Sequence, residues 1–323
     1  MSKQLGLVFL FLLVYCSVNI AQSKLLEIPE FGSNPGNLKL FVHTPNNSDT
    51  LKRPLVIVLH GCSQTANEVA ELTGWNKLSD LHNFIVLYPQ QKFINNSNHC
   101  FNWFEEKDIT KGQGECQSIF EMIVYAQKKY SIDSTRIFIT GLSAGAAMSV
   151  AMAATHPNKF NNAAVFAGTA YGVAQNVVEG FKVMRGKKTV SQTELVKLVT
   201  SQNSLYKGAY SKLIIYHGTG DGIVNYSNAT LLLKQWAGIQ GCDTIPDKTE
   251  KSFAGIPEIT RLEYQNTKGE QLVSFYQITN LGHRLLIHPG NKEEEGGRMM
   301  MFATDKGFHS TYHVAKEFGI LKK

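Results

Sequence analysis

The chain has 323 residues, of which 43% are hydrophobic and 18% are charged. This length and apolar content allow a large buried core, and the ordinary glycine and proline content excludes a collagen-like, coiled-coil or broadly disordered protein. The formal net charge of +6 is spread thinly along the sequence, so it does not favour nucleic-acid binding. A globular protein is therefore indicated, and a single α/β domain can account for the whole length.

Residues 1–23 are typical of a secretory signal peptide. Lys3 precedes a low-charge apolar stretch from Leu5 to Val18, and the small residues Ala21 and Ser23 follow it. This stretch is shorter than the roughly 18 residues needed to span a bilayer as a helix, so an uncleaved anchor is the weaker alternative. We predict that residues 24–323 form the mature, secreted domain, extracellular or periplasmic, with no stable membrane partner.

Short apolar runs rich in β-branched residues recur along the chain and predict buried strands. They lie at residues 54–59, 84–88, 136–140, 163–166, 213–216 and 272–278. Between them, residues 115–130 have apolar side chains at helical spacing, and residues 144–156 form an Ala- and Met-rich stretch that ends before Pro157. Strands that alternate with helices predict a mostly parallel sheet covered by helices on both faces.

Two stretches do not follow this alternation. Residues 168–211 contain an amphipathic piece at 193–199 and are expected to form helices over the edge of the sheet. Residues 241–258 are polar and are expected to form a loop. Either stretch could face the substrate, although ordinary surface connections explain both equally well.

The segment Gly141–Gly145 matches the pattern G-x-S-x-G. It lies between the predicted strand at 136–140 and the helix that begins at Ala144, which is the strand-turn-helix context of a nucleophilic serine in α/β-hydrolases. Ser143 is therefore the predicted nucleophile. The backbone N–H of Ala144, at the helix N-terminus, is the first predicted oxyanion donor.

A serine nucleophile needs a base and an acid that orients the base, and in this fold both follow strands in the order Ser, Asp or Glu, His. Asp221 follows the predicted strand at 213–216 and is the predicted acid. A turn aspartate is the alternative for Asp221. Asp243 and Asp247 are weaker candidates because no predicted strand precedes them.

His283 is the predicted base because it follows the strand at 272–278 and has a glycine immediately before it. Other histidines fall too late in the chain, as do His288, His309 and His313, or too close to the acid, as does His217.

The loop after the strand at 54–59 begins with His60 and Gly61, and the N–H of Cys62 is the second predicted oxyanion donor. His60 is expected to shape the substrate-binding site rather than to act as a base. The chain lacks the spacings of a zinc site, a P-loop or a dinucleotide fold, so we predict no metal and no cofactor.

With these motifs placed, the chain from about Pro54 resembles the polyhydroxybutyrate-depolymerase family of esterases, which includes feruloyl and acetylxylan esterases. The shared segments are HGCSQ, YPQQ, NWF, GQGE, GLSAGAAMS, HGTGD, Gly282-His283 and FHSTYHVAKEFGI. The resemblance implies an α/β-hydrolase fold and triad roles for Ser143, Asp221 and His283. It also implies that Trp103 lines the substrate groove, although a structural tryptophan is an almost equal alternative.

The chain departs from the family after His283, where Arg284–Ile287 replace the expected aromatic and small residues, which leaves the shape of the pocket open. We expect a serine esterase that forms an acyl-enzyme, acting on polyhydroxyalkanoate polyester or on feruloyl or acetyl esters of plant polysaccharide. The alternatives are a non-catalytic protein that binds polysaccharide or polyester and, less favoured, a serine peptidase. The oligomeric state stays open.

Outside the signal peptide the chain has the cysteines Cys62, Cys100, Cys116 and Cys242. An even set in an exported chain indicates disulfides, although buried free thiols are the alternative and sequence alone does not choose the pairing. We predict a bridge between Cys62 and Cys100, which would join the proposed oxyanion loop to the segment before Trp103. Cys116 and Cys242 form a second bridge or remain free.

Overall fold

The computed structural model describes residues 25–45 and 51–322, so the predicted signal peptide lies outside the described residues. Within these residues the chain forms a ten-stranded sheet. Its strands are β1 (Leu26–Ile28), β2 (Lys39–His43), β3 (Arg53–Leu59), β4 (Ile85–Gln90), β5 (Ile132–Leu142), β6 (Asn162–Phe166), β7 (Lys212–Gly218), β8 (Lys248–Glu250), β9 (Ile259–Gln265) and β10 (Gln271–Ile278).

The strand order is β1-β2-β4-β3-β5-β6-β7-β10-β9-β8. The central strands from β4 to β10 in this order are mutually parallel, whereas β2 and β9 pair antiparallel to them. Each of the apolar runs found in the sequence forms one of these parallel strands. The prediction of a mostly parallel sheet is confirmed.

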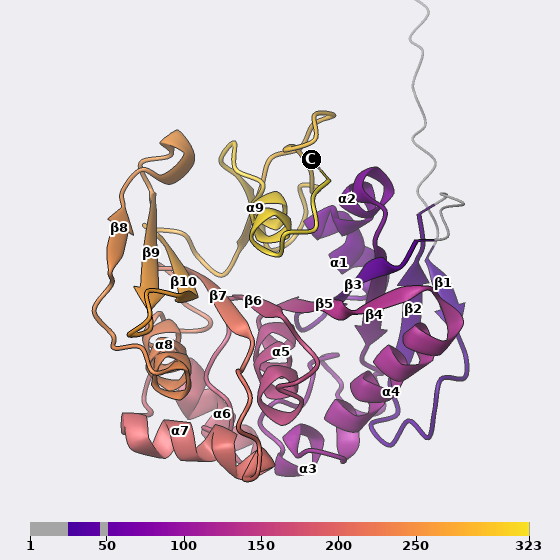
Figure 1. Ribbon diagram of the computed structural model, residues 1–323, viewed down its shortest axis with the longest axis horizontal. Helices are drawn as coiled ribbons and strands as arrows, with labels where there is room; N and C mark the ends of the chain where they lie inside the picture. The colour runs from indigo at the N-terminus through magenta and orange to yellow at the C-terminus, as the bar shows by residue number, and fades with distance from the viewer. Residues whose placement is uncertain (1–24, 46–50, 323) are drawn as a thin grey trace, which may run out of the picture.

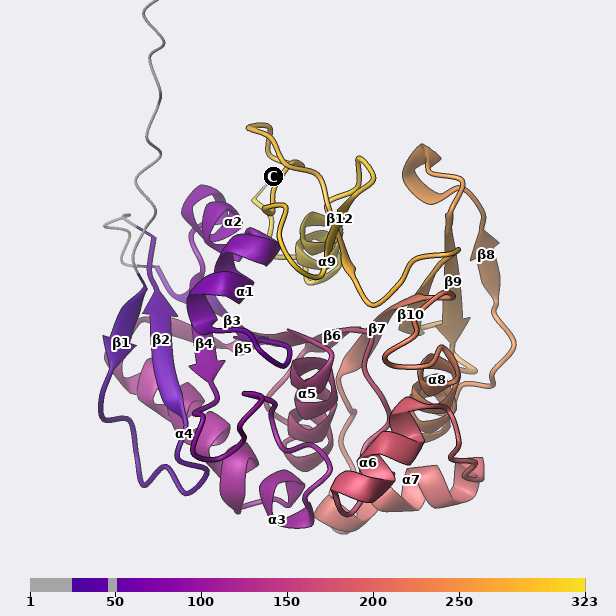
Figure 2. The same ribbon diagram turned by 180° about the vertical axis from the view of Figure 1, so that it is seen from behind.

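Helices cover both faces of the sheet, and Figures 1 and 2 show α1, α2 and α9 on one side and α3 to α8 on the other. Their bounds are α1 (Ala66–Thr73), α2 (Trp75–His82), α3 (Glu106–Ile109), α4 (Gly114–Lys129), α5 (Ala144–Thr155), α6 (Val177–Met184), α7 (Gln192–Thr200), α8 (Ser227–Gln240) and α9 (Ser310–Glu317). Alternate residues of β3 enter separate cores: Leu55 and Ile57 pack on the α4 and α5 side, and Val56 and Val58 on the α1 side. None of the helices in the described ranges is long and apolar enough to cross a membrane.

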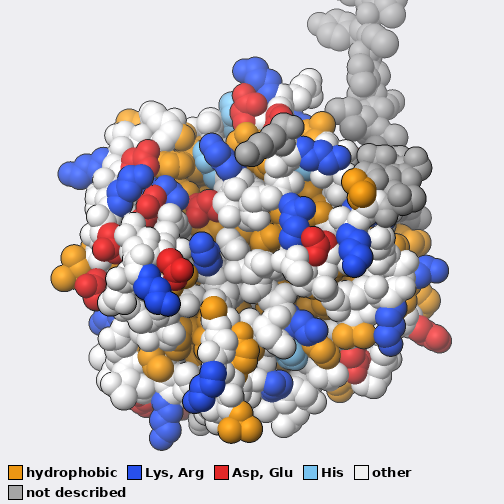
Figure 3. All heavy atoms as spheres, in the orientation of Figure 1, with side chains coloured by type: hydrophobic (Ala, Val, Ile, Leu, Met, Phe, Trp, Pro, Cys, Tyr) orange, Lys and Arg blue, Asp and Glu red, His pale blue; other side chains and the backbone are white. Residues whose placement is uncertain are grey.

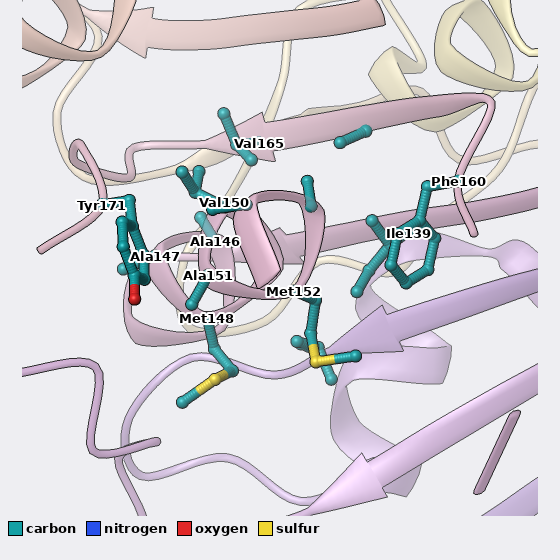
Figure 4. Packing of buried hydrophobic residues seen from close by; sticks show 14 of the residues in the cluster. Ile139, Ala146, Ala147, Met148, Val150, Ala151, Met152, Phe160, Val165 and Tyr171 are labelled. Carbon is teal, nitrogen blue, oxygen red and sulfur yellow. The ribbon is translucent and has the colours of Figure 1, made fainter. Parts of the chain in front are cut away.

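The helix α5 occupies the centre of one core, and every residue in it is buried. Figure 4 shows Ala146 and Val150 of this helix close to Val165 of β6, and Met152 of α5 and Ile139 of β5 belong to the same buried cluster. Small alanine side chains allow the helix to lie close to the sheet. This packing fixes the start of α5, where the candidate nucleophile lies.

The structure corrects two expectations about the connections. Residues 168–211 do form helices, α6 and α7, but α7 packs against α8 and α5 instead of covering the edge of the sheet. Residues 241–258 contain the strand β8, which pairs with β9 at the sheet edge. Its sequence Lys-Thr-Glu looked like a loop because an edge strand with little burial carries no apolar run.

The segment after His283, where the chain departs from the resembling family, forms the short strand β11 (Leu285–Ile287). It pairs in parallel with β12 (Ala303–Asp305) in a separate two-stranded sheet. All of β11 is buried against the core on the α1 and α9 side. The apolar residues at this position therefore serve the packing of the fold.

Candidate active site

Ser143 lies in the turn between β5 and α5 with φ 57° and ψ −118°, a conformation that non-glycine residues rarely adopt. Its N–H donates to the carbonyl of Phe166 at 2.9 Å, which ties the turn to the end of β6. A Cβ at Gly145 would lie 2.4 Å from the carbonyl oxygen of Leu59, and a Cβ at Gly141 would lie 2.4 Å from the backbone of Gly145. Gly145 is therefore needed for the turn to approach β3, and Gly141 is needed for the start of α5 to lie against the end of β5.

The residues of the two candidate oxyanion donors, Cys62 and Ala144, line the same small cavity as Ser143. Ala144 is the first residue of α5, where backbone N–H groups have no partner within the helix and the helix dipole favours negative charge. Cys62 follows β3 in a loop that is held by a hydrogen bond of 2.7 Å from the N–H of Ser63 to the carbonyl of Asn98.

The predicted disulfide between Cys62 and Cys100 is present and joins the same two loops covalently. The remaining described cysteines, Cys116 and Cys242, are buried free thiols, so the alternative of a second bridge does not hold in this structure.

A small cavity of about 30 Å³ adjoins Ser143. Its lining includes Cys62 and Trp103 from the disulfide-linked loops, Met184 from α6, and Val224. Trp103, placed at the groove by resemblance, thus borders the same space as Ser143. Met184 comes from residues 168–211, one of the two stretches considered as facing the substrate.

The candidate acid and base are hydrogen-bonded to each other: Nδ1 of His283 lies 2.7 Å from Oδ2 of Asp221. Burial alone would raise the pKa of Asp221, but hydrogen bonds from His217, His283 and the N–H of Val224 outweigh it and hold the pKa well below its usual range. Asp221 is therefore a carboxylate that can only accept, so Nδ1 of His283 donates and Nε2 is free to take a proton.

The loop that carries the candidate acid Asp221 also carries Val224, which lines the cavity next to the candidate nucleophile. The N–H of Val224 donates to Oδ1 of Asp221 at 2.8 Å, and the same residue lines the cavity next to Ser143. Ser143 follows β5, Asp221 follows β7 and His283 follows β10. Because these strands are parallel, the structure places all three predicted triad residues at the same edge of the sheet.

His217, which lies too close to Asp221 in the sequence to be its base, contacts this acid in the structure. Its Nε2 lies 2.8 Å from the carbonyl of Val224, to which it donates, and 3.5 Å from Oδ2 of Asp221. The side chain is fully buried. The motif HGTGD was the available signal, but the sequence does not show that its first and last residues meet.

His60 is fully buried and is absent from the cavity lining. Its Nδ1 donates to the carbonyl of Gly61 at 2.7 Å, and its Nε2 accepts from the N–H of Gln91 at 3.0 Å. Burial lowers the pKa of His60 to about 4, so the ring is neutral. Any effect of His60 on substrate is exerted through the loop backbone. In the part of the chain that the structure describes, no cluster of His, Cys, Asp and Glu is arranged to hold a metal.

A serine in a strained turn after a central parallel strand, with an Asp–His pair at neighbouring strand ends, is the arrangement of the serine hydrolases with the α/β-hydrolase fold. This chain is a serine hydrolase of that fold. It belongs to the esterase PHB depolymerase family, whose model matches residues 38–256, and it is accordingly a carboxylic ester hydrolase.

Individual relatives agree with this assignment. Poly(3-hydroxyalkanoate) depolymerase C of Paucimonas lemoignei is 38% identical over 297 residues, which cover 92% of this chain and 70% of that protein. Acetylxylan esterase A of Aspergillus awamori is 31% identical over 279 residues, or 84% of this chain and 88% of that protein. A solved acetyl xylan esterase from Aspergillus awamori superposes with a TM-score of 0.73 at 28% identity, covering 80% of this chain and 94% of the other.

Proposed function

We propose that Ser143, His283 and Asp221 form a catalytic triad. Ser143 attacks the ester carbonyl, His283 takes the serine proton and passes it to the leaving alcohol, and Asp221 stabilises the charged ring. The N–H groups of Cys62 and Ala144 bind the oxyanion, and water then hydrolyses the acyl-enzyme. The observation that carries this proposal is the hydrogen bond between Asp221 and His283. Asp221 belongs to the loop whose Val224 lines the cavity next to Ser143.

The size of the cavity favours a short acyl group. One water molecule needs about 10–15 Å³ of such space, so about 30 Å³ accommodates only a few heavy atoms. A feruloyl group carries an aromatic ring and exceeds this space. Of the acyl groups under consideration, acetyl is the smallest, and 3-hydroxybutyryl, with six heavy atoms, is smaller than feruloyl.

Exposed apolar side chains on α6 and next to Val224 favour a polyester. The helix α6 contributes Met184 to the cavity and exposes Val177, Val178 and Phe181 to solvent. Ile223, next to Val224, is exposed as well. A hydrophobic polymer can bury these side chains, whereas a hydrated polysaccharide buries them less well. We therefore propose a polyester of short hydroxyalkanoic acids as the substrate.

Acetylated xylan is the second candidate, favoured by the similarity to the solved acetyl xylan esterase. We also propose that the protein acts outside the cytoplasm, as its predicted signal peptide indicates. The face shown in Figure 3 carries basic and acidic side chains intermixed, without a continuous field of one sign.

Hydrolysis of a polyhydroxybutyrate film, acetylated xylan and methyl ferulate by the wild type and by Ser143→Ala tests these proposals. We expect release of hydroxybutyrate from the film, little turnover of methyl ferulate, and a loss of about 10⁶ in kcat for the alanine variant. Preferential hydrolysis of methyl ferulate would contradict the short acyl group. Activity above about a hundredth of wild type in Ser143→Ala would exclude Ser143 as the nucleophile.

Phe181→Ser separates polymer binding from chemistry. It should reduce film hydrolysis and leave turnover of soluble p-nitrophenyl acetate unchanged, because Phe181 is exposed and lies outside the cavity lining. Equal loss on both substrates would contradict the polyester surface.

A further inference from the structure

A buried carboxyl group lies behind the two loops that the disulfide joins. It belongs to Glu115 in the first turn of α4, which is 1% exposed. Its Oε2 accepts from the N–H of Asn102 at 2.9 Å, and its Oε1 accepts from the side-chain amides of Asn102, at 2.9 Å, and of Gln91. Asn102 immediately precedes Trp103, so Glu115 holds the backbone that carries this wall of the cavity.

Gln91 extends the chain of hydrogen bonds to the other loop. Its side chain binds Glu115 and the carbonyl of Cys100 at 3.1 Å, while its backbone N–H donates to Nε2 of His60 at 3.0 Å. The opposite ring nitrogen of His60 donates to the carbonyl of Gly61 at 2.7 Å. That carbonyl and the N–H of Cys62 belong to one planar trans peptide and point in opposite directions. The hydrogen bond from His60 therefore sets the direction of the Cys62 N–H.

Burial disfavours the charged form of Glu115. Burial, followed by the nearby charge of Asp108, raises the pKa of Glu115 from 4.5 to about 8. Because the unfolded chain releases this proton at lower pH, the contribution of Glu115 to the free energy of unfolding decreases as pH rises from 4.5 to about 8. Independently of its pKa, the hydrogen bonds of Glu115 link it to the segments that carry Cys62 and Trp103, which both line the cavity.

We propose that Glu115 is a positioning residue that aims the Cys62 N–H through Gln91 and His60 and holds Trp103 through Asn102. This inference rests on the proposed function, in which Cys62 supplies an oxyanion donor. The disulfide joins the same two loops covalently.

The variant Glu115→Gln tests this role with little change in side-chain volume. Above pH 8, Glu115 is the carboxylate that accepts these hydrogen bonds, so the assay is run there. The amide of the variant replaces one acceptor oxygen by an N–H₂ group that faces donors, which breaks the hydrogen-bond chain. With p-nitrophenyl acetate we expect kcat to fall about 10- to 100-fold, less than the 10²- to 10³-fold of a lost oxyanion donor, with KM changing less than about threefold. A trifluoromethyl ketone, whose adduct with serine carries an oxyanion, should bind more weakly by the same factor as kcat/KM falls.

Glu317→Gln is the matched control. Glu317 in α9 also accepts hydrogen bonds, from Tyr276 and from Ser274 at 2.8 Å, but it lies outside the cavity lining. This variant should lower Tm and leave kcat and inhibitor affinity unchanged. If Glu115→Gln fails to fold, Gln91→Met replaces it, because it removes the amide link and leaves Asn102 bound to Glu115.

The proposal is overturned if the folded Glu115 or Gln91 variant keeps kcat and inhibitor affinity within about twofold of wild type, far from the effect of a displaced oxyanion donor. It is also overturned if the Glu317 variant loses kcat to the same extent, since the effect would then follow general destabilisation. If the proposed triad itself is wrong, a different result is expected: Ser143→Ala keeps its esterase activity in the same assay.

Discussion

Removing the disulfide between Cys62 and Cys100 is expected to lower both Tm and kcat. The bridge closes a segment with a sequence separation of 38. For this separation the chain-entropy relation gives a loss of about 4 kcal/mol in the free energy of unfolding. A domain of about 300 residues has an unfolding entropy of about 0.6 kcal/mol/K, so Tm should fall by about 6 °C.

The effect on kcat has a separate origin in the structure. Without the bridge, the loop of Cys62 is still held by the hydrogen bond from Ser63 to Asn98 and by His60. The candidate oxyanion donor is therefore loosened and not lost, and kcat should fall by less than the hundredfold typical of removing a donor.

The double variant Cys62→Ser/Cys100→Ser should be compared with wild type by calorimetry and by kinetics with p-nitrophenyl acetate. A reductant should reproduce its effects in wild type and change nothing in the double variant, because the remaining described cysteines are free thiols. A Tm and kcat equal to wild type in the double variant would refute the reasoning. A further response of the double variant to reductant would show that another bridge contributes.

Three further expectations can be measured on the same protein. Asp221→Asn should lower kcat by about 10⁴ with the fold retained, because the amide leaves His283 in the wrong tautomer; steady-state kinetics that keep a tenth of the activity would contradict the role of Asp221. Gly145→Ala should lose activity and stability because its Cβ would lie 2.4 Å from the carbonyl oxygen of Leu59. Gly222→Ala is the control and should keep the wild-type Tm, because its Cβ meets nothing within 4 Å. Equal Tm values for the two variants would disprove the steric argument. Burial lowers the pKa of several histidines from 6.5 to about 4: His60, His156 and His309. Since the unfolded chain binds these protons first, the free energy of unfolding should fall as pH drops from 6.5 to about 4, by up to about 1.4 kcal/mol per pH unit for each ring; urea unfolding curves that are flat over this range would contradict it.

The central strands were predictable because each is buried on both faces and therefore forms a continuous apolar run. The run Pro54–Leu59 is an example, since every one of its residues is buried in β3. The flanking strand β9 has the sequence Ile-Thr-Arg-Leu-Glu-Tyr-Gln, in which polar residues interrupt the apolar ones. Such strands become recognisable only through their partners in the sheet.

The candidate active site, like the sheet, was predictable only in part. Ser143, Asp221 and His283 could be selected because each follows a predicted strand, and the order of such residues along the chain is a property of the fold. The role we propose for Glu115 depends on hydrogen bonds to Gln91 and Asn102 that only folding brings about. The motifs YPQQ, NWF and GQGE contain these residues, but no sequence pattern states that they meet.

Both ends of the large sheet terminate in strands of only three residues, β1 and β8. An unpaired strand edge is a template on which a second molecule can add a strand, and aggregation by this route requires a long, flat edge. Here the outermost edges offer few free backbone groups, and β8 adds two charged side chains, Lys248 and Glu250. An enzyme that accumulates at high local concentration on a solid substrate would thereby be protected from edge-to-edge aggregation.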